Sequence, residues 1–234
     1  DSFIRQLAKR PPPYSPGIVA QSGFSFDLLG LALESSSQQT LGTYFLRHLF
    51  IPLDMWDTGF NPPAGLETRL VIPDDGLAKG GSPVRDPRDP VIFECGGACL
   101  TGTASDYRRF ASMLLNGGQL GEQTVLSRLS VDMMTRHQLA MTTDNQLPAF
   151  IETDELRRAG LRSGLGLALI PGRVPLPLPL QAGDFGVWAP GGSFFWVSPN
   201  EALAVVMLAV LPRTQTSARL QQRVIGLIAQ AIAK

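Results

Sequence analysis

The sequence is poor in the residues that metal and redox sites use most, with two cysteines and two histidines among its 234 residues. A structural zinc ion usually takes four Cys or His ligands, so we expect no metal and no cofactor. Cys95 and Cys99 stand in the segment ECGGAC. This spacing allows either two reduced, partly buried thiols or a local disulfide, and we favour the thiols. His48 and His137 fall in separate helical patterns, so both are expected at the surface or at helix ends.

Net charge and long apolar runs are lacking as well. The 20 Lys and Arg residues balance the 20 Asp and Glu residues, so the charge points neither to nucleic acid nor to an anionic membrane surface as a partner. The longest apolar run, Ala202 to Leu211, has ten residues, which is too short for a transmembrane helix. The chain begins with Asp1 rather than methionine, and we interpret it as a processed or shortened product. The compartment is left open, with the cytoplasm, the periplasm and secretion all compatible.

Residues 1–160 are interpreted as a helical subdomain with one irregular surface excursion, the proline-rich stretch 61–92. Thr103 with Asp106 resembles a capping box at the start of the clearest helix. The predicted helices cover residues 2–10, 24–33, 40–50, 104–116 and 130–137. The second of them is apolar all round and is expected to be buried.

Residues 161–234 are interpreted as an antiparallel sheet followed by a helix. The apolar segments LRSGLGLALI, DFGVWA, SFFWVS and ALAVVMLAV are predicted as successive strands. Residues 217–233 are predicted as an amphipathic helix whose inward-facing residues are Val224, Ile225, Ile228 and Ile232. Helices first, then a meander of strands and a final helix, predict an α+β fold.

Four segments resemble motifs of a known family. SPG followed by SGFSFDLLGLALESSS is similar to its Pro-Gly and its Leu-Leu-Gly helix, and IPLDMWDTGF to its Pro-Leu-Gly-Met-x-Asp-Thr-x-Phe signature. CGGACLTGTASDYRRFASMLLNGG and GGSFFWVSPNEALAVVMLAV resemble its Gly-Gly-x-Gly-Leu helix and its closing sheet. In this order the chain resembles the C-terminal two-thirds of the serine β-lactamase-like superfamily, which includes class C β-lactamases, D-alanyl-D-alanine carboxypeptidases and family VIII-type esterases. The resemblance implies a β-lactamase/transpeptidase-like fold that lacks its N-terminal part.

The chemistry that this family performs is acyl transfer through the serine of a Ser-x-x-Lys motif, whose lysine takes the proton of the serine. The chain has three lysines, and none has a serine three positions before it. The residues at that spacing are Gln6 before Lys9, Gly76 before Lys79 and Ala231 before Lys234. The resemblance therefore places the motif upstream of Asp1, in the part of the fold that this chain lacks.

The second motif of the family supplies a tyrosine to the proton relay, followed by Ser-Asn. Counted back from Gly30, these positions hold Gln21, Ser22 and Gly23. A glutamine amide does not titrate near neutral pH and cannot act as a phenolate. Tyr14 aligns with a loop position and is not favoured as a substitute. Ser22 is better explained as a helix-entry cap than as a nucleophile.

The third motif, Lys-Thr-Gly, His-x-Gly or Trp-Gly-Gly, edges the site, and the residue after it donates a backbone N–H to the oxyanion hole. Aligned without gaps from GSFFW, the motif becomes Val187, Trp188 and Ala189, with Pro190 as donor. Proline has no N–H, and losing one oxyanion donor typically costs about 10²–10³ in rate. With one residue deleted in the turn, the motif shifts to Trp188, Ala189 and Pro190, and Gly191 donates. Both registers stay open.

Two functions follow from the resemblance. In the first, which we favour, the domain is catalytically degenerate and acts in binding or scaffolding, with a small acyl or ester compound or a peptide as its ligand. In the second, the chain is part of an active serine esterase or β-lactamase-type acyl hydrolase whose nucleophile lies on an N-terminal fragment or a partner chain. Without such a piece, the apolar face of the helix over 217–233 would be partly uncovered and would demand a partner.

Overall fold

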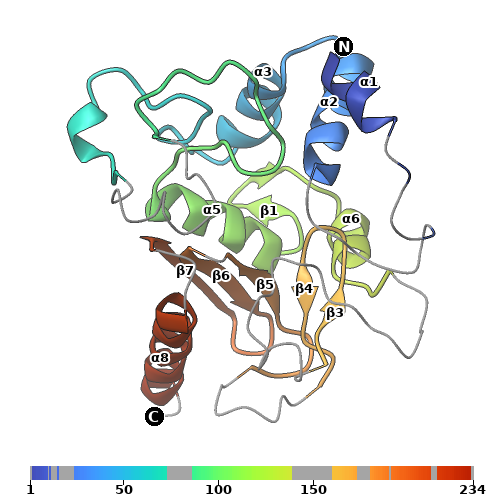
Figure 1. Cartoon of the computed structure of the whole chain (residues 1–234). Coiled ribbons are helices and arrows are strands. Elements are labelled where there is room, and N and C mark those ends of the chain that lie inside the picture. Colours follow the sequence, from blue (N-terminus) through green and yellow to red (C-terminus); the bar gives the residue numbers. More distant parts are fainter. Residues whose placement is uncertain are drawn as a thin grey trace.

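The computed structural model describes residues 2–9, 11, 15, 24–72, 86–138, 160–172, 180–189, 191–211 and 215–232. Figure 1 shows an antiparallel sheet with α5 (Ala104–Leu115) across one face and α8 (Gln215–Ile232) on the other side. The helices from the first part of the chain lie beyond α5, away from the sheet. The predicted α+β class is confirmed.

The helices agree with the sequence-based predictions to within a few residues at their ends. They are α1 (Ser2–Leu7), α2 (Ser25–Ser37), α3 (Leu41–Phe45), the π-helical η1 (Leu46–Phe50), the 3-10 turn η2 (Glu67–Arg69), α5, α6 (Arg128–Met134) and α8. The strands are β1 (Gln119–Leu120), β2 (Gln123–Thr124), β3 (Arg162–Ser163), β4 (Ala168–Leu169), β5 (Phe185–Trp188), β6 (Gly192–Ser198) and β7 (Leu203–Val210). In the described parts of the excursion 61–92, η2 is the one regular element.

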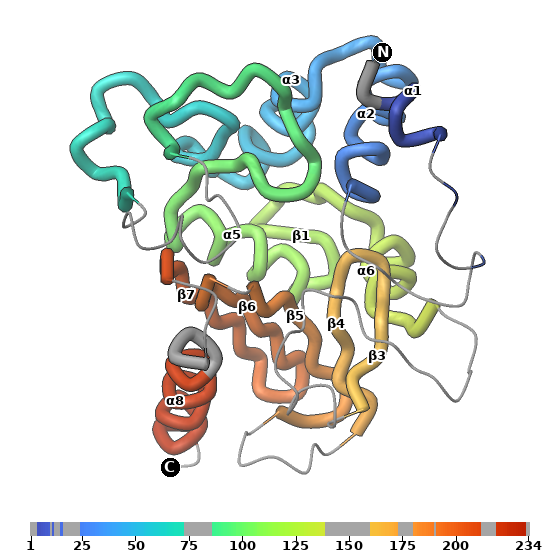
Figure 2. The backbone as a smooth tube through the Cα atoms, viewed as in Figure 1, coloured from blue at the N-terminus to red at the C-terminus, as the bar shows by residue number. Residues whose placement is uncertain are grey.

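The main sheet has five strands in the order β3-β4-β5-β6-β7, and each strand is antiparallel to its neighbour. Figure 2 shows β7 at one edge and β3 at the other. LRSGLGLALI, predicted as one strand, instead forms the β3–β4 hairpin, in which Arg162 pairs with Leu169. Gly166 has a φ of 74°, a left-handed conformation that belongs to a turn and would interrupt a strand.

The two faces of the sheet form two separate cores. Because side chains alternate along a strand, Phe195 and Val197 of β6 pack on the face that α5 covers, while Phe194 and Trp196 pack on the face that α8 covers. We call these the α5-side core and the α8-side core. Since α5 belongs to the first 160 residues, those residues share a core with the sheet, and the domain boundary at residue 160 stays a prediction.

Helix α5 begins at the predicted Thr103 cap, but the Asp106 carboxylate forms its hydrogen bonds with residues outside the helix. The side chain of Thr103 accepts a hydrogen bond from the Asp106 N–H at 3.2 Å. The Asp106 carboxylate accepts from the Asp57 N–H at 2.9 Å and from the Thr58 hydroxyl at 2.8 Å, so it ties the helix to residues 57–58. The predicted apolar stripe of the helix packs in the α5-side core as Tyr107, Phe110, Ala111, Leu114 and Leu115.

Two predictions about burial are wrong. Helix α2 is not buried all round, since Leu29 is 63% exposed, because α3 and the loop at Gly96 cover only one side of it. On α8, Ile225 is buried, and Val224 and Ile228 pack against the α8-side core as predicted. Ile232 is 40% exposed, because it is the last residue of the helix and lies beyond that core.

Candidate functional site

The β5–β6 hairpin ends in a tight turn at the residues predicted as the third motif. The Ala189 N–H donates to the Ser193 carbonyl at 2.8 Å, and the Gly192 N–H donates to the Ala189 carbonyl at 3.1 Å. Gly192 has a φ of 94°, which glycine adopts without strain. The Gly191 carbonyl accepts from the Leu211 N–H at 3.0 Å, so Gly191 is tied to the residue that follows β7.

Val187 and Trp188 belong to opposite faces of the sheet. Val187 is partly buried against the α5-side core, and Trp188 is buried in the α8-side core. The remaining predicted site residues, Gln21, Ser22, Gly23 and Pro190, lie outside the described residues, as does Tyr14. That the second and third motifs meet in one cleft therefore stays a prediction.

A buried glutamine of α8 holds the turn from the α8 side. Gln221 is 5% exposed, and its amide Nε2 donates to the carbonyls of Ala189 at 2.9 Å and Ser193 at 3.1 Å. This residue is absent from the predicted site. The one signal in the sequence is its position four residues before Ile225, which puts a polar side chain on the inward face of an amphipathic helix.

A serine side chain joins the same turn to β7. The Ser193 hydroxyl donates to the Ala209 carbonyl at 2.8 Å and accepts from the Ala209 N–H at 2.9 Å. These bonds lie where the β6–β7 register shifts, between Gly192 and Phe194. The side chain thus bonds to β7 backbone groups at the irregularity in the ladder.

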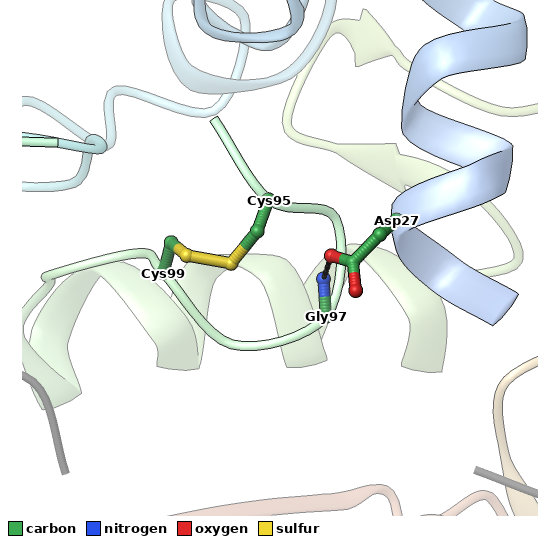
Figure 3. The surroundings of a disulfide bond; sticks show 4 residues. All are labelled: Asp27, Cys95, Gly97 and Cys99. Atoms are coloured by element: carbon green, nitrogen blue, oxygen red, sulfur yellow. Dashed lines mark hydrogen bonds between the residues drawn. A yellow bond between two sulfur atoms is a disulfide. The ribbon is translucent and has the colours of Figure 1, made fainter. Parts of the chain in front are cut away.

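Cys95 and Cys99 form a disulfide, with Cα atoms 5.5 Å apart, so the preference for reduced thiols is wrong. Figure 3 shows the loop between them turned toward α2, where the Gly97 N–H donates to Asp27 Oδ1 at 3.1 Å. At Gly96, an added Cβ would stand 2.1 Å from the Phe26 carbonyl oxygen. The two glycines allow a tight loop against α2, and this loop brings the cysteines within bonding reach.

The disulfide loop is also anchored at both of its ends. Before it, the Glu94 carboxylate accepts from the Gly42 N–H at 2.7 Å. After it, Thr101 and Gly59 exchange two backbone hydrogen bonds of 2.8 and 2.9 Å. The loop therefore connects α2, α3 and the segment at Gly59, and it leads directly into α5.

A cavity of about 400 Å³ lies between the disulfide loop and the end of the sheet. Its walls include residues 69–71, residues 98–102, Tyr107 of α5 and residues 208–210 of β7, and Ser193 connects it to the hairpin turn. Clefts of this size hold small molecules. The sequence contains no motif for this cavity, because its walls come from several segments that lie far apart in the chain.

Tyr107 is the phenol in this cavity. Its ring lies against Phe110 and Phe195, with centroids 5.7 and 5.6 Å away. Burial raises the pKa of the Tyr107 hydroxyl, so the group stays neutral and can donate a hydrogen bond.

A second cavity, of about 170 Å³, lies beside β3 and β4 and is lined by His137 and Asp184. Asp184 is 1% exposed, and its Oδ2 accepts from the indole N–H of Trp196 at 2.9 Å and the Gln181 N–H at 3.0 Å. Burial raises the pKa of the Asp184 carboxyl, and its hydrogen bonds oppose this rise. No serine, cysteine or lysine stands among the described residues of its wall, so it is not assigned as a nucleophilic site.

Metal binding and membrane spanning have little support among the described residues. No three His, Cys, Asp or Glu residues there are grouped so as to hold a metal ion. None of the described helices is both long and apolar enough to cross a membrane. His48 is exposed, as predicted.

Known proteins resemble the chain in sequence and in fold. Protein Rv1367c of Mycobacterium tuberculosis is 27% identical over 216 residues, which are 89% of this chain and 53% of that protein. EstCE1, described as a hydrolase with promiscuous acyltransferase activity, has a TM-score of 0.73 at 21% identity, covering 95% of this chain and 60% of its own. Simvastatin synthase from Aspergillus terreus has a TM-score of 0.70 at 15% identity, covering 95% and 58%. The chain thus spans about half the length of the curated relatives that it matches.

The family match agrees with the fold. The sequence matches the Beta-lactamase family over residues 1–230, nearly the whole chain. The family match and the similar structures confirm a β-lactamase/transpeptidase-like fold, which agrees with the described antiparallel sheet and its helices. This chain belongs to the Beta-lactamase family, within the serine hydrolase superfamily.

Proposed function

We propose that this chain is a catalytically incomplete β-lactamase-like domain, which acts by binding a ligand or a partner and performs no serine acyl transfer by itself. The observation that carries the proposal lies in the sequence, which contains no Ser-x-x-Lys and has Gln21 at the position of the relay tyrosine. The structure adds how the hairpin turn of the third motif is held. The Gly191 carbonyl accepts from the Leu211 N–H, and Gln221 holds the Ala189 and Ser193 carbonyls from the other side.

This bonding is compatible with both registers of the third motif, and we favour the ungapped register because Gln21 also stands in the place of the relay tyrosine. In the shifted register the backbone N–H of Gly191 would supply the oxyanion donor, and the hydrogen bond that the Gly191 carbonyl accepts from Leu211 does not occupy that N–H. In the ungapped register the donor position falls on Pro190, which has no N–H. A missing oxyanion donor costs about 10²–10³ in rate, so a site of this kind would be a poor catalyst even with a nucleophile.

Two sequence features support the proposal independently of the turn. The chain contains no Ser-x-x-Lys, and Gln21 stands at the position of the relay tyrosine. Without a lysine or a phenol to take its proton, a serine hydroxyl is a weak nucleophile. The ligand class that fits this reading is a small acyl or ester compound or a peptide, held without being cleaved.

The length of the relatives favours a second candidate function. This chain covers 60% of EstCE1 and 58% of simvastatin synthase. It could thus supply the sheet half of an active serine acyl hydrolase, with the nucleophile on another polypeptide segment. In that case the substrates would be esters or β-lactams, and the segment would be the partner of this chain.

Active-site labelling separates the two candidates. The purified chain is treated with a fluorophosphonate probe and with a fluorescent penicillin, and turnover of nitrocefin and p-nitrophenyl butyrate is measured. Urea-unfolded chain serves as the control for non-specific labelling, and circular dichroism confirms the fold of the sample. Intact mass and N-terminal sequencing identify every polypeptide present.

We expect neither labelling nor turnover above the buffer rate. Labelling of this chain would overturn the proposal, and loss of the label in Ser22→Ala would then assign the nucleophile to Ser22. Labelling confined to a co-purifying polypeptide would establish the second candidate instead.

A further inference from the structure

The cavity behind the disulfide loop has the chemistry of a binding site for a neutral molecule. Its walls are mostly apolar and include Leu70, Leu100 and Leu208. The one cation among the described residues of the wall, Arg69, already forms an ion pair with Asp57 at 3.5 Å. An anionic ligand would have to compete with that carboxylate, whereas a neutral apolar ligand would gain from leaving water.

The hydroxyl groups in the wall select for a hydrogen-bond acceptor. The Thr58 hydroxyl already donates to Asp106, and the Ser193 hydroxyl already donates to the Ala209 carbonyl. Among the described wall residues, the hydroxyls of Tyr107 and Thr101 remain as neutral donors. Contacts with Phe110 and Phe195 fix the Tyr107 ring. A carbonyl or ether oxygen on the ligand is the natural partner for this phenol.

The disulfide forms part of the same wall. Cys99 lines the cavity with its neighbours Ala98 and Leu100, and the bond to Cys95 closes the loop that carries them. Ala98 is exposed and both cysteines are half-buried, so a small thiol can reach the bond. Once it is cut, residues 98–100 are held mainly through the hydrogen bonds of Gly97 and Thr101 on either side.

We propose that this cavity binds a small, neutral, apolar molecule with one hydrogen-bond acceptor, and that the Cys95–Cys99 disulfide makes the binding sensitive to redox state. A dithiol reductant supplies two electrons and two protons. The S–S bond breaks, Cys95 and Cys99 become thiols, and the reductant becomes a disulfide. After reduction, residues 98–100 of the cavity wall are less constrained and must become ordered when the molecule binds, which weakens the affinity of the cavity for it. This site is independent of whether the chain carries out serine chemistry.

The test uses prodan, a neutral naphthalene ketone whose emission shifts to the blue in apolar surroundings. The oxidised chain is expected to bind it saturably with one site per chain. Tyr107→Phe keeps the ring contacts but removes the donor, and should weaken binding about three- to tenfold. Ala98→Trp, which fills the cavity, should abolish binding, while Leu129→Trp, which adds an indole on α6 away from the cavity, should leave it unchanged.

Reduction tests the second half of the proposal. Dithiothreitol, with complete reduction shown by thiol titration, should weaken prodan binding at least fivefold. The double variant Cys95→Ser with Cys99→Ser should bind weakly with or without dithiothreitol, and circular dichroism checks its fold. Absent binding, or equal binding in Ala98→Trp, overturns the site. Equal affinity before and after complete reduction overturns the role of the disulfide. Neither result bears on the labelling test for serine chemistry.

Discussion

The indole N–H of Trp196 donates to Asp184 Oδ2 at 2.9 Å on the α8 side of the sheet. Asp184 is almost completely buried, and burial raises the pKa of its carboxyl above the ordinary value. The folded chain therefore holds this proton more tightly than the unfolded chain does. Between the ordinary pKa of about 4 and the raised value, the folded state binds more protons, so the free energy of unfolding rises as the pH falls and declines as the pH rises.

Asp184→Asn should remove this dependence on pH, because the amide keeps an acceptor for Trp196 but carries no charge. The measurement is urea unfolding of both chains at several pH values between about 4 and 7. The stability of the wild type relative to Asp184→Asn should increase as the pH falls. Glu122→Gln, at an exposed position, serves as the control. Parallel curves for the wild type and Asp184→Asn would show that Asp184 does not titrate in this range.

Gln221→Leu should destabilise the fold by about 1–3 kcal/mol, because it removes two hydrogen bonds from a buried turn. The Ala189 and Ser193 carbonyls each keep one backbone donor, which limits the loss. Urea unfolding measures the effect, and Gln230→Leu, at an exposed position of the same helix, is the matched control. Equal stability of the two variants would mean that the contact adds nothing to the turn.

Gly96→Ala should destabilise the chain by about 1–3 kcal/mol or more, because the new Cβ would meet the Phe26 carbonyl oxygen at 2.1 Å and push the loop off α2. Gly172→Ala is the control, since no atom lies within 4 Å of its added Cβ. Thermal unfolding compares the two variants. A Gly96→Ala chain as stable as Gly172→Ala would contradict the close packing of loop and helix.

Strand β7 should make the chain associate at high concentration. Within the described ranges this apolar strand pairs only with β6, and Leu208 is 44% exposed. An unpaired edge of this kind recruits further strands. Sedimentation velocity should show concentration-dependent association, which Leu208→Lys reduces and Leu129→Lys, on α6, does not. A wild-type monomer at every concentration would argue that the edge is protected.

Local patterns were enough to predict the helices and the order of the strands. The Thr103 cap joins residues within one helical turn, and the apolar stripe of α5 lies within about three turns. Both features therefore depend only on residues that are close in the sequence. The strand order follows because consecutive antiparallel strands pair as a meander. The LRSGLGLALI segment was misassigned because its glycines turn the chain back, an effect that a count of apolar residues does not register.

Contacts between distant residues could be decided only by the tertiary structure. The loop that the disulfide closes is held by a hydrogen bond from Gly97 to Asp27, 70 positions earlier in the chain. The hydrogen bond from Gln221 to Ala189 joins residues 32 positions apart, and the walls of the cavity come from several separate segments. Sequence spacing carries no information on such distances, because they result from the packing of whole elements. The absence of Ser-x-x-Lys can be read from the sequence by itself. The hydrogen bond between Leu211 and Gly191 depends on the pairing of β6 with β7, which only the tertiary structure decides.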